Sequence, residues 1–76
     1  MEELIKFLNS LSQAGREEFE RNTQTSINYL RKSASTKRPL GTKLCVRIEA
    51  ETSGLINRKM LRPHDWHENW PELIAA

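Results

Sequence analysis

Between Arg21 and Ile48 the sequence contains no aspartate or glutamate, although the whole chain has ten acidic residues. It is also poor in cysteine and glycine, with a single Cys45 and three glycines. One cysteine excludes an intramolecular disulfide. The chain lacks an apolar run long enough to cross a bilayer, which excludes a transmembrane helix. With no Gly-rich phosphate loop and no nucleophile motif, nothing in the sequence indicates an enzyme.

The chain is 76 residues long, which predicts a single domain, 1–76. A fraction of 37% hydrophobic and 29% charged residues is typical of a soluble globular domain rather than a disordered tail. This length leaves little room for a substrate-sized pocket. We therefore expect no catalytic activity, no cofactor, no metal and no small-molecule substrate.

Two features of the sequence indicate a location inside the cell. The N-terminal Met1-Glu2-Glu3 is acidic, unlike the basic start of a secretory signal. Cys45 has apolar neighbours, Leu44 and Val46, and is expected to be a buried small hydrophobe in a reducing compartment. The expectation is a cytoplasmic protein that does not contact the membrane.

Basic residues fill the segment that has no acids. It carries Arg21, Arg31, Lys32, Lys37, Arg38, Lys43 and Arg47. The rest of the chain has five basic and ten acidic residues, so the net charge of +2 conceals a strong asymmetry. Such a concentrated cationic stretch is typical of a surface that binds a polyanion. The plain alternative is a solvated basic face without a ligand, because most charge runs are only that.

Hydrophobic spacing predicts an all-α fold of four or five short helices. In the first, Leu4, Ile5 and Leu8 recur at helical intervals, and in the third Leu30 is the inward residue. The expected helices span residues 2–11, 15–22, 25–33, 40–52 and 58–61. Residues 63–76 form a C-terminal extension.

The second and third helices form a pair suited to DNA. Two short helices joined by a tight turn present the second of them to the major groove. With Leu30 facing inward, Asn28 suits adenine, Arg31 suits guanine, and an exposed Ile27 suits a thymine methyl. Flexible cations at the end of the third helix and at the start of the second helix suit phosphates. The candidate DNA-binding residues are Arg16, Thr25, Ser26, Ile27, Asn28, Arg31, Lys32, Lys37 and Arg38.

Three stretches carry a resemblance to a known family. TSINYLRK at residues 25–32 resembles the TS-x-x-YLRK stretch of small phage and prophage Cro-like regulators. LCVRIE at 44–49 resembles their fourth helix, and LRPHDW at 61–66 resembles the ending of the YdaS-type branch. The resemblance runs in order over about residues 4 to 71.

This resemblance implies a DNA-binding transcriptional regulator, or repressor, of the lambda-repressor-like helix-turn-helix fold. Such regulators act at the nucleoid of a bacterial host, often bind double-stranded operators as homodimers, and are sometimes described as antitoxins. By position, the family's recognition surface falls on Ser26, Ile27, Asn28, Arg31 and Lys32. The alternative function is an antitoxin or antirepressor-type protein-interaction module that keeps the fold without binding DNA.

Two residues depart from the family pattern. Gln24 occupies a turn position that is commonly glycine, and a non-glycine residue adopts a left-handed conformation there at some cost. Glu20 replaces an alanine that usually permits close helix packing. We expect it to need space or a partner such as Arg16, Arg21 or Gln24.

The C-terminal extension holds two further constellations. His64 and His67, near Asp65 and Glu68, have a spacing that a metal site can use, but a solvated helical turn is the expected structure. Trp66 and Trp70 either cover the small core against the first helix or form a dimer interface, where large aromatics are favoured.

Overall fold

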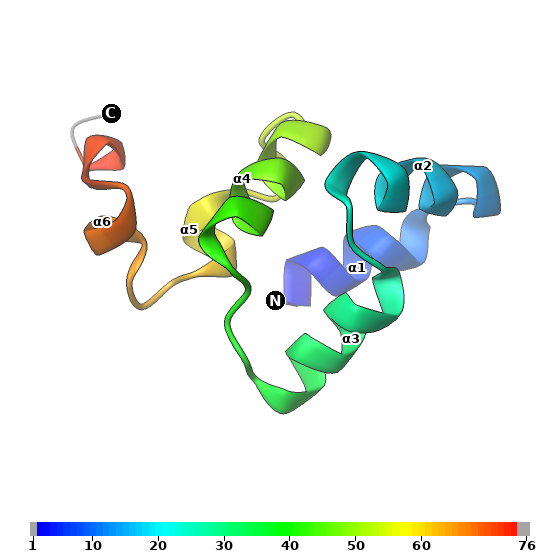
Figure 1. Ribbon diagram of the computed structural model, residues 1–76, viewed down its shortest axis with the longest axis horizontal. Helices are drawn as coiled ribbons and strands as arrows, with labels where there is room; N and C mark the ends of the chain where they lie inside the picture. The colour runs from blue at the N-terminus through cyan, green and yellow to red at the C-terminus, as the bar shows by residue number, and fades with distance from the viewer. Residues whose placement is uncertain (1, 75–76) are drawn as a thin grey trace.

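The computed structural model, which describes residues 2–74, is built from helices joined by short connections (Figure 1). The described residues contain no strand, so the expected all-α fold is confirmed. No described helix is both long and apolar enough to cross a membrane. The elements are α1 (Glu2–Ser10), α2 (Gln13–Thr23), α3 (Ile27–Thr36), α4 (Thr42–Glu51), α5 (Arg58–Leu61), α6 (Trp66–Asn69) and the 3-10 helix η1 (Pro71–Leu73).

Polar side chains fix where three of the helices begin. Ser12 caps α2 by accepting a hydrogen bond from the Gly15 amide at 3.1 Å, so α2 starts at Gln13, two residues before the expected position. Ser26 caps α3 in the same way, accepting from the Tyr29 amide at 3.0 Å. Asn57 caps α5. Each cap satisfies an amide that has no partner within its own helix.

The residues that cap the C-terminal ends of α2 and α3 have a left-handed backbone conformation. Gln24 has φ 59° and Lys37 has φ 58°, and neither is a glycine. The Gln24 amide donates to the Glu20 carbonyl at 2.9 Å, which closes the last turn of α2. Gln24 therefore adopts the left-handed conformation that its position in the turn requires.

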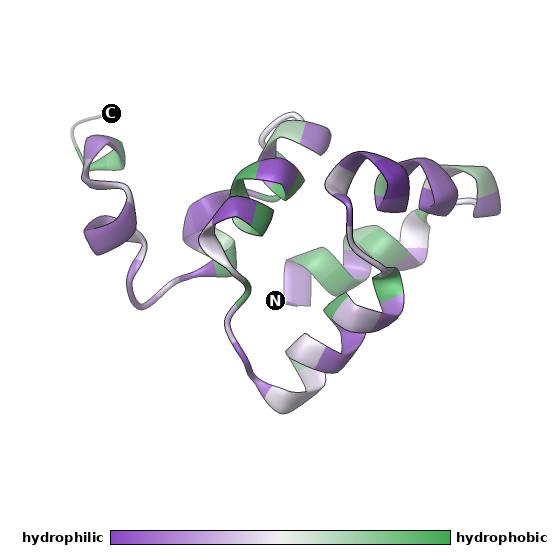
Figure 2. Cartoon of the chain, viewed as in Figure 1, coloured by the Kyte–Doolittle hydropathy of each residue, from purple (hydrophilic) through white to green (hydrophobic). Residues whose placement is uncertain are grey.

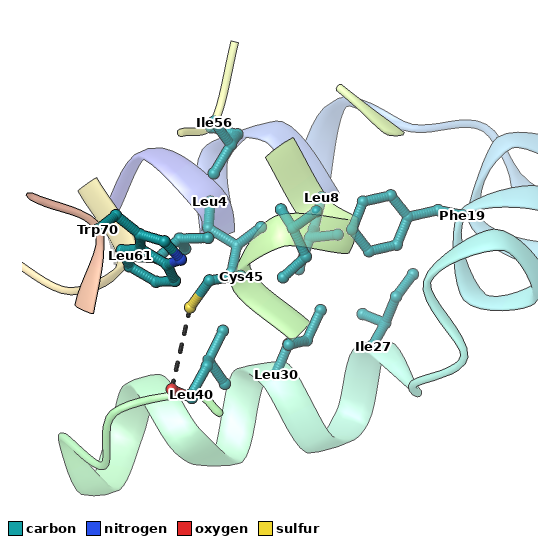
Figure 3. Packing of buried hydrophobic residues seen from close by; sticks show 11 residues of the cluster. Leu4, Leu8, Phe19, Ile27, Leu30, Leu40, Cys45, Ile56, Leu61 and Trp70 are labelled. Carbon is teal, nitrogen blue, oxygen red and sulfur yellow. Dashed lines mark hydrogen bonds between the residues drawn. The ribbon is translucent and has the colours of Figure 1, made fainter. Parts of the chain in front are cut away.

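The hydrophobic core is formed by side chains from every α-helix except α6, and from the connections between them. Leu4 and Leu8 of α1 lie at its centre (Figure 3). In the hydropathy colouring, α1 is mostly green, whereas α2 and α6 are mostly purple (Figure 2). Helix α1 packs against α3, and α4 packs against both α2 and α5. The buried hydrophobic residues are Leu4, Leu8, Phe19, Ile27, Leu30, Leu40, Cys45, Ile48, Ile56, Leu61 and Trp70.

Trp70 brings the C-terminal segment into this core. Helix α6 and η1 lie at the opposite end of the molecule from α2 (Figure 1). Trp70 is nevertheless only 8% exposed and belongs to the same cluster as Leu61 and Leu4 (Figure 3). Trp66 is half-buried and packs on the edge of the cluster. Of the two alternatives for the tryptophans, the structure favours covering the core.

Cys45 is a free thiol buried in the centre of α4. Its Sγ lies 3.9 Å from the carbonyl oxygen of Leu40 (Figure 3). Burial disfavours the thiolate and raises the pKa of Cys45 from 9.0 to about 11. The thiol therefore stays protonated at neutral pH, as a small hydrophobic residue of the core.

Candidate nucleic-acid interface

Helix α3 rests on the core by one face and leaves the other open. Ile27, Leu30 and Ser33 are buried, because positions three apart lie on the same side of a helix. The opposite side is called here the outer face of α3. It consists of the exposed residues Asn28, Tyr29, Lys32, Ser35 and Thr36.

The expectation that Ile27 faces outward is wrong. Ile27 is 7% exposed and points into the core together with Leu30 (Figure 3). The two residues are separated by three positions, so a helix that buries Leu30 also buries Ile27. Ile27 therefore does not contact a thymine methyl, and its role is to anchor the start of α3.

Arg31 lies at the boundary between the buried and the outer face. It is half-buried, and its Nη2 donates to the Asn9 Oδ1 of α1 at 2.8 Å. This bond turns the guanidinium toward α1 and occupies one of its five donors. Asn28 and Lys32, in contrast, are exposed.

The other candidate DNA-binding residues, which precede α3, differ in their exposure and in their hydrogen bonds. Ser26 is exposed, with its hydroxyl engaged as the cap of α3, and Thr25 is half-buried in the turn. Arg16 is half-buried in α2, and its buried Nε has no hydrogen-bond partner within residues 2–74. A buried donor without a partner is costly, and because this Nε is inaccessible it does not by itself mark a contact for a ligand.

Three exposed cations follow along and beyond α3. Lys32 is on the outer face, and Lys37 and Arg38 lie in the loop after it. In the part of the chain that is described, none of them is within salt-bridge distance of a carboxylate, since the pairs found are Lys6–Glu2, Arg58–Glu49, Arg58–Glu72 and Arg62–Asp65. The cations of the segment without acids thus have no carboxylate partner within residues 2–74 after the chain has folded.

Glu20 places one carboxylate at the beginning of α3. Its Oε2 accepts a hydrogen bond from the Ile27 amide at 2.7 Å, so its partner is the backbone rather than Arg16, Arg21 or Gln24. A carboxylate is stabilising at this end of a helix, where the helix dipole is positive. The bond also links α2 directly to the start of α3.

Tyr29 belongs to the outer face but is absent from the set of residues expected from the sequence. Its side chain is 49% exposed, unusual for a large aromatic residue. Beside it lies a hollow of about 470 Å³, lined by Tyr29, Lys32, Ser33, Thr36 and Arg38. Tyr29 stands four positions before the buried Ser33 and thus at the edge of the buried side of the helix, so the spacing alone does not predict its exposure.

The histidine-containing segment is organised around an ion pair. Arg62 makes a two-pronged contact with Asp65, with Nε–Oδ1 at 2.9 Å and Nη2–Oδ2 at 2.6 Å. This hydrogen bonding lowers the pKa of Asp65. His64 and His67 are exposed, and within residues 2–74 no three His, Cys, Asp or Glu side chains gather in a way that can hold a metal ion.

Comparison with known proteins does not place the chain in a family. No protein-family model matches it, and neither the curated proteins nor the solved structures contain a match.

Proposed function

We propose that α2 and α3 form the helix-turn-helix of a sequence-specific DNA-binding regulator that inserts α3 into the major groove of an operator. The observation that carries this proposal is the outer face of α3 with its following loop. There, Lys32, Lys37 and Arg38 are exposed and have no carboxylate partner within residues 2–74. Duplex DNA is the polyanion that a single exposed helix of this kind fits, because the major groove is wide enough to admit one helix.

The contacts divide by the chemistry of the side chains. Asn28 is exposed near the N-terminal end of α3, where a recognition helix reaches the bases, and its amide suits adenine. Tyr29, Lys32 and Arg38 line the hollow beside this helix and suit the sugar-phosphate backbone. Arg31 is fixed by Asn9 and reaches DNA only with its other donors.

Two copies of the chain would read a pseudo-palindrome with half-sites about one helical turn apart. The resemblance to phage and prophage Cro-like regulators supports a repressor that acts as a homodimer on double-stranded DNA in a bacterial cytoplasm. Selection of bound duplexes from a random pool would give the operator and show whether it is symmetric.

The first prediction concerns the two cations of the hollow. In Lys32→Gln/Arg38→Gln, the slope of log affinity against log salt should fall in magnitude by roughly 0.9 for each phosphate that the protein no longer neutralises. Fluorescence anisotropy with a random-sequence duplex at several salt concentrations measures this slope. Lys59→Gln/Lys6→Gln removes the same charge from α5 and α1 and should leave the slope nearly unchanged.

The alternative function, an antitoxin or antirepressor-type module, is favoured by two contacts. Glu20 occupies the start of α3 and Asn9 occupies part of Arg31, so fewer groups remain free for bases than in the simplest helix-turn-helix. This alternative predicts no mobility shift with random duplex DNA at low salt and a stable complex with an acidic protein. The same anisotropy experiment decides between the two functions.

A further inference from the structure

An open cavity lies between α1, the C-terminal part of α3 with its following loop, and residues 61–65. Its volume is about 710 Å³, which is within the range of small-molecule sites. The length of the chain predicted little room for such a pocket, and this one is open to solvent, with the residues directly after α5 forming part of its wall. The apolar residues of the lining are Ile5, Ala34, Pro39, Leu61 and Pro63.

The charged residues at the rim do not balance one another. Glu2 is paired with Lys6 at 3.5 Å, and Asp65 is paired with Arg62 at 2.6 Å. Arg62 also lines the cavity and so offsets Asp65 there, whereas Lys6 lies outside the lining and its pair with Glu2 is exposed to solvent. Lys37 and Arg38 also line the cavity and have no salt-bridge partner in the described part of the chain. The lining, with three cations against the carboxylates of Glu2 and Asp65, therefore has an excess of one positive charge beside an apolar floor.

We propose that this cavity binds a small amphipathic anion, with its apolar body against Ile5, Ala34 and Leu61 and its anionic head against Lys37 and Arg38. A site of this size takes a ligand the size of a medium-chain carboxylate rather than a folded partner, which would need a much larger contact area. The apolar body supplies most of the affinity, because its methylene groups are removed from water against the apolar lining.

One consequence rests on the proposed function. Arg38 lines both the cavity and the hollow beside Tyr29 and Lys32. An anion in the cavity therefore engages a cation that DNA phosphates would use, and it adds a negative charge next to them. The bound ligand should weaken DNA binding, which would make it an effector.

The experiment is a titration of the full chain with decanoate below its micelle concentration, followed by amide chemical shifts. Decanol tests the apolar body without the charge, and inorganic phosphate tests the head alone. Decanoate should bind more tightly than either, with the largest shifts at Ile5, Ala34 and Leu61.

Charge-matched variants test the head. The double variant Lys37→Gln/Arg38→Gln should weaken decanoate binding by roughly fivefold, which is the largest effect expected from one exposed ion pair. It should leave decanol binding unchanged. Lys43→Gln/Arg47→Gln removes two exposed cations of α4 that do not line the cavity, and should leave both affinities unchanged. All four residues are exposed, so the variants are expected to fold.

Three results would overturn the proposal. They are equal affinity for decanol and decanoate, an equal fall in decanoate affinity in the two double variants, and shifts confined to other exposed apolar residues such as Leu55. None of these depends on DNA. If decanoate binds as expected but no duplex binds at low salt, the cavity assignment stands and the proposed function fails.

Discussion

The arginines of the C-terminal region have carboxylate partners within the fold, whereas the cations of the segment around α3 have none within residues 2–74. Arg58 contacts Glu49 at 2.9 Å and Glu72 at 3.8 Å, and its guanidinium lies 5.3 Å from the centre of the Trp70 ring. Lys32 and Lys37 have no comparable partner among the described residues. Charges that are paired within the fold support the structure, whereas charges left unpaired at the surface are available for a ligand.

The two regions are joined through the carbonyl of Leu40. Leu40 follows the basic loop directly, and its oxygen accepts a hydrogen bond from Nη1 of Arg62 and a weak one from the Cys45 thiol. The same Arg62 is bound by Asp65. The C-terminal region, whose arginines are paired with carboxylates, therefore holds the loop that carries the unpaired cations. Folding of the C-terminal region thus helps to position these cations.

The largest expected effect comes from removing the C-terminal anchor. Trp70→Ala should lower the free energy of unfolding by about 3–5 kcal/mol, because a large buried side chain is removed from the core. Urea unfolding followed by circular dichroism measures this. Trp66→Ala, at a half-buried position, should cost less. Equal costs would mean that Trp70 is no anchor.

A smaller effect is expected from the thiol between the two regions. The pKa of Cys45 is raised to about 11, so above pH 9 the unfolded chain loses this proton while the folded chain retains it. Stability should therefore fall as pH rises from about 9 to 11, by about 2 kcal/mol. Cys45→Ala should lack this component. The measurement is the difference between the two unfolding curves, and parallel curves across this pH range would contradict the prediction.

The smallest effect is expected where a carboxylate touches the start of α3. Glu20→Gln should destabilise the fold by about 0.3–1 kcal/mol, the value of an anion at a helix N-terminus. It should also raise affinity for random duplex DNA slightly, because a negative charge near the outer face is removed. Glu17→Gln, at an exposed position on α2, is the control for net charge. A fall in DNA affinity specific to Glu20→Gln would show that the carboxylate mainly positions α3.

Local signals predicted the parts of this fold that depend on neighbours along the chain. Helical spacing predicted that Leu4, Leu8 and Leu30 face the core, and all three are fully buried. The burial of Ile27 follows from the same spacing, because it lies three positions before Leu30. The direction of Arg31 depends on Asn9, 22 residues away, and no local pattern contains that contact.

By itself, the sequence determined the all-helical character and the absence of acids from residues 21–48, because each follows from spacing or composition along the chain. Only the tertiary structure decided which cations stay unpaired, that the Glu20 carboxylate binds the Ile27 amide, and that a cavity opens beside Lys37 and Arg38. The physical reason is that ion pairs, hydrogen bonds and cavities depend on distances of a few ångströms between residues far apart in the chain.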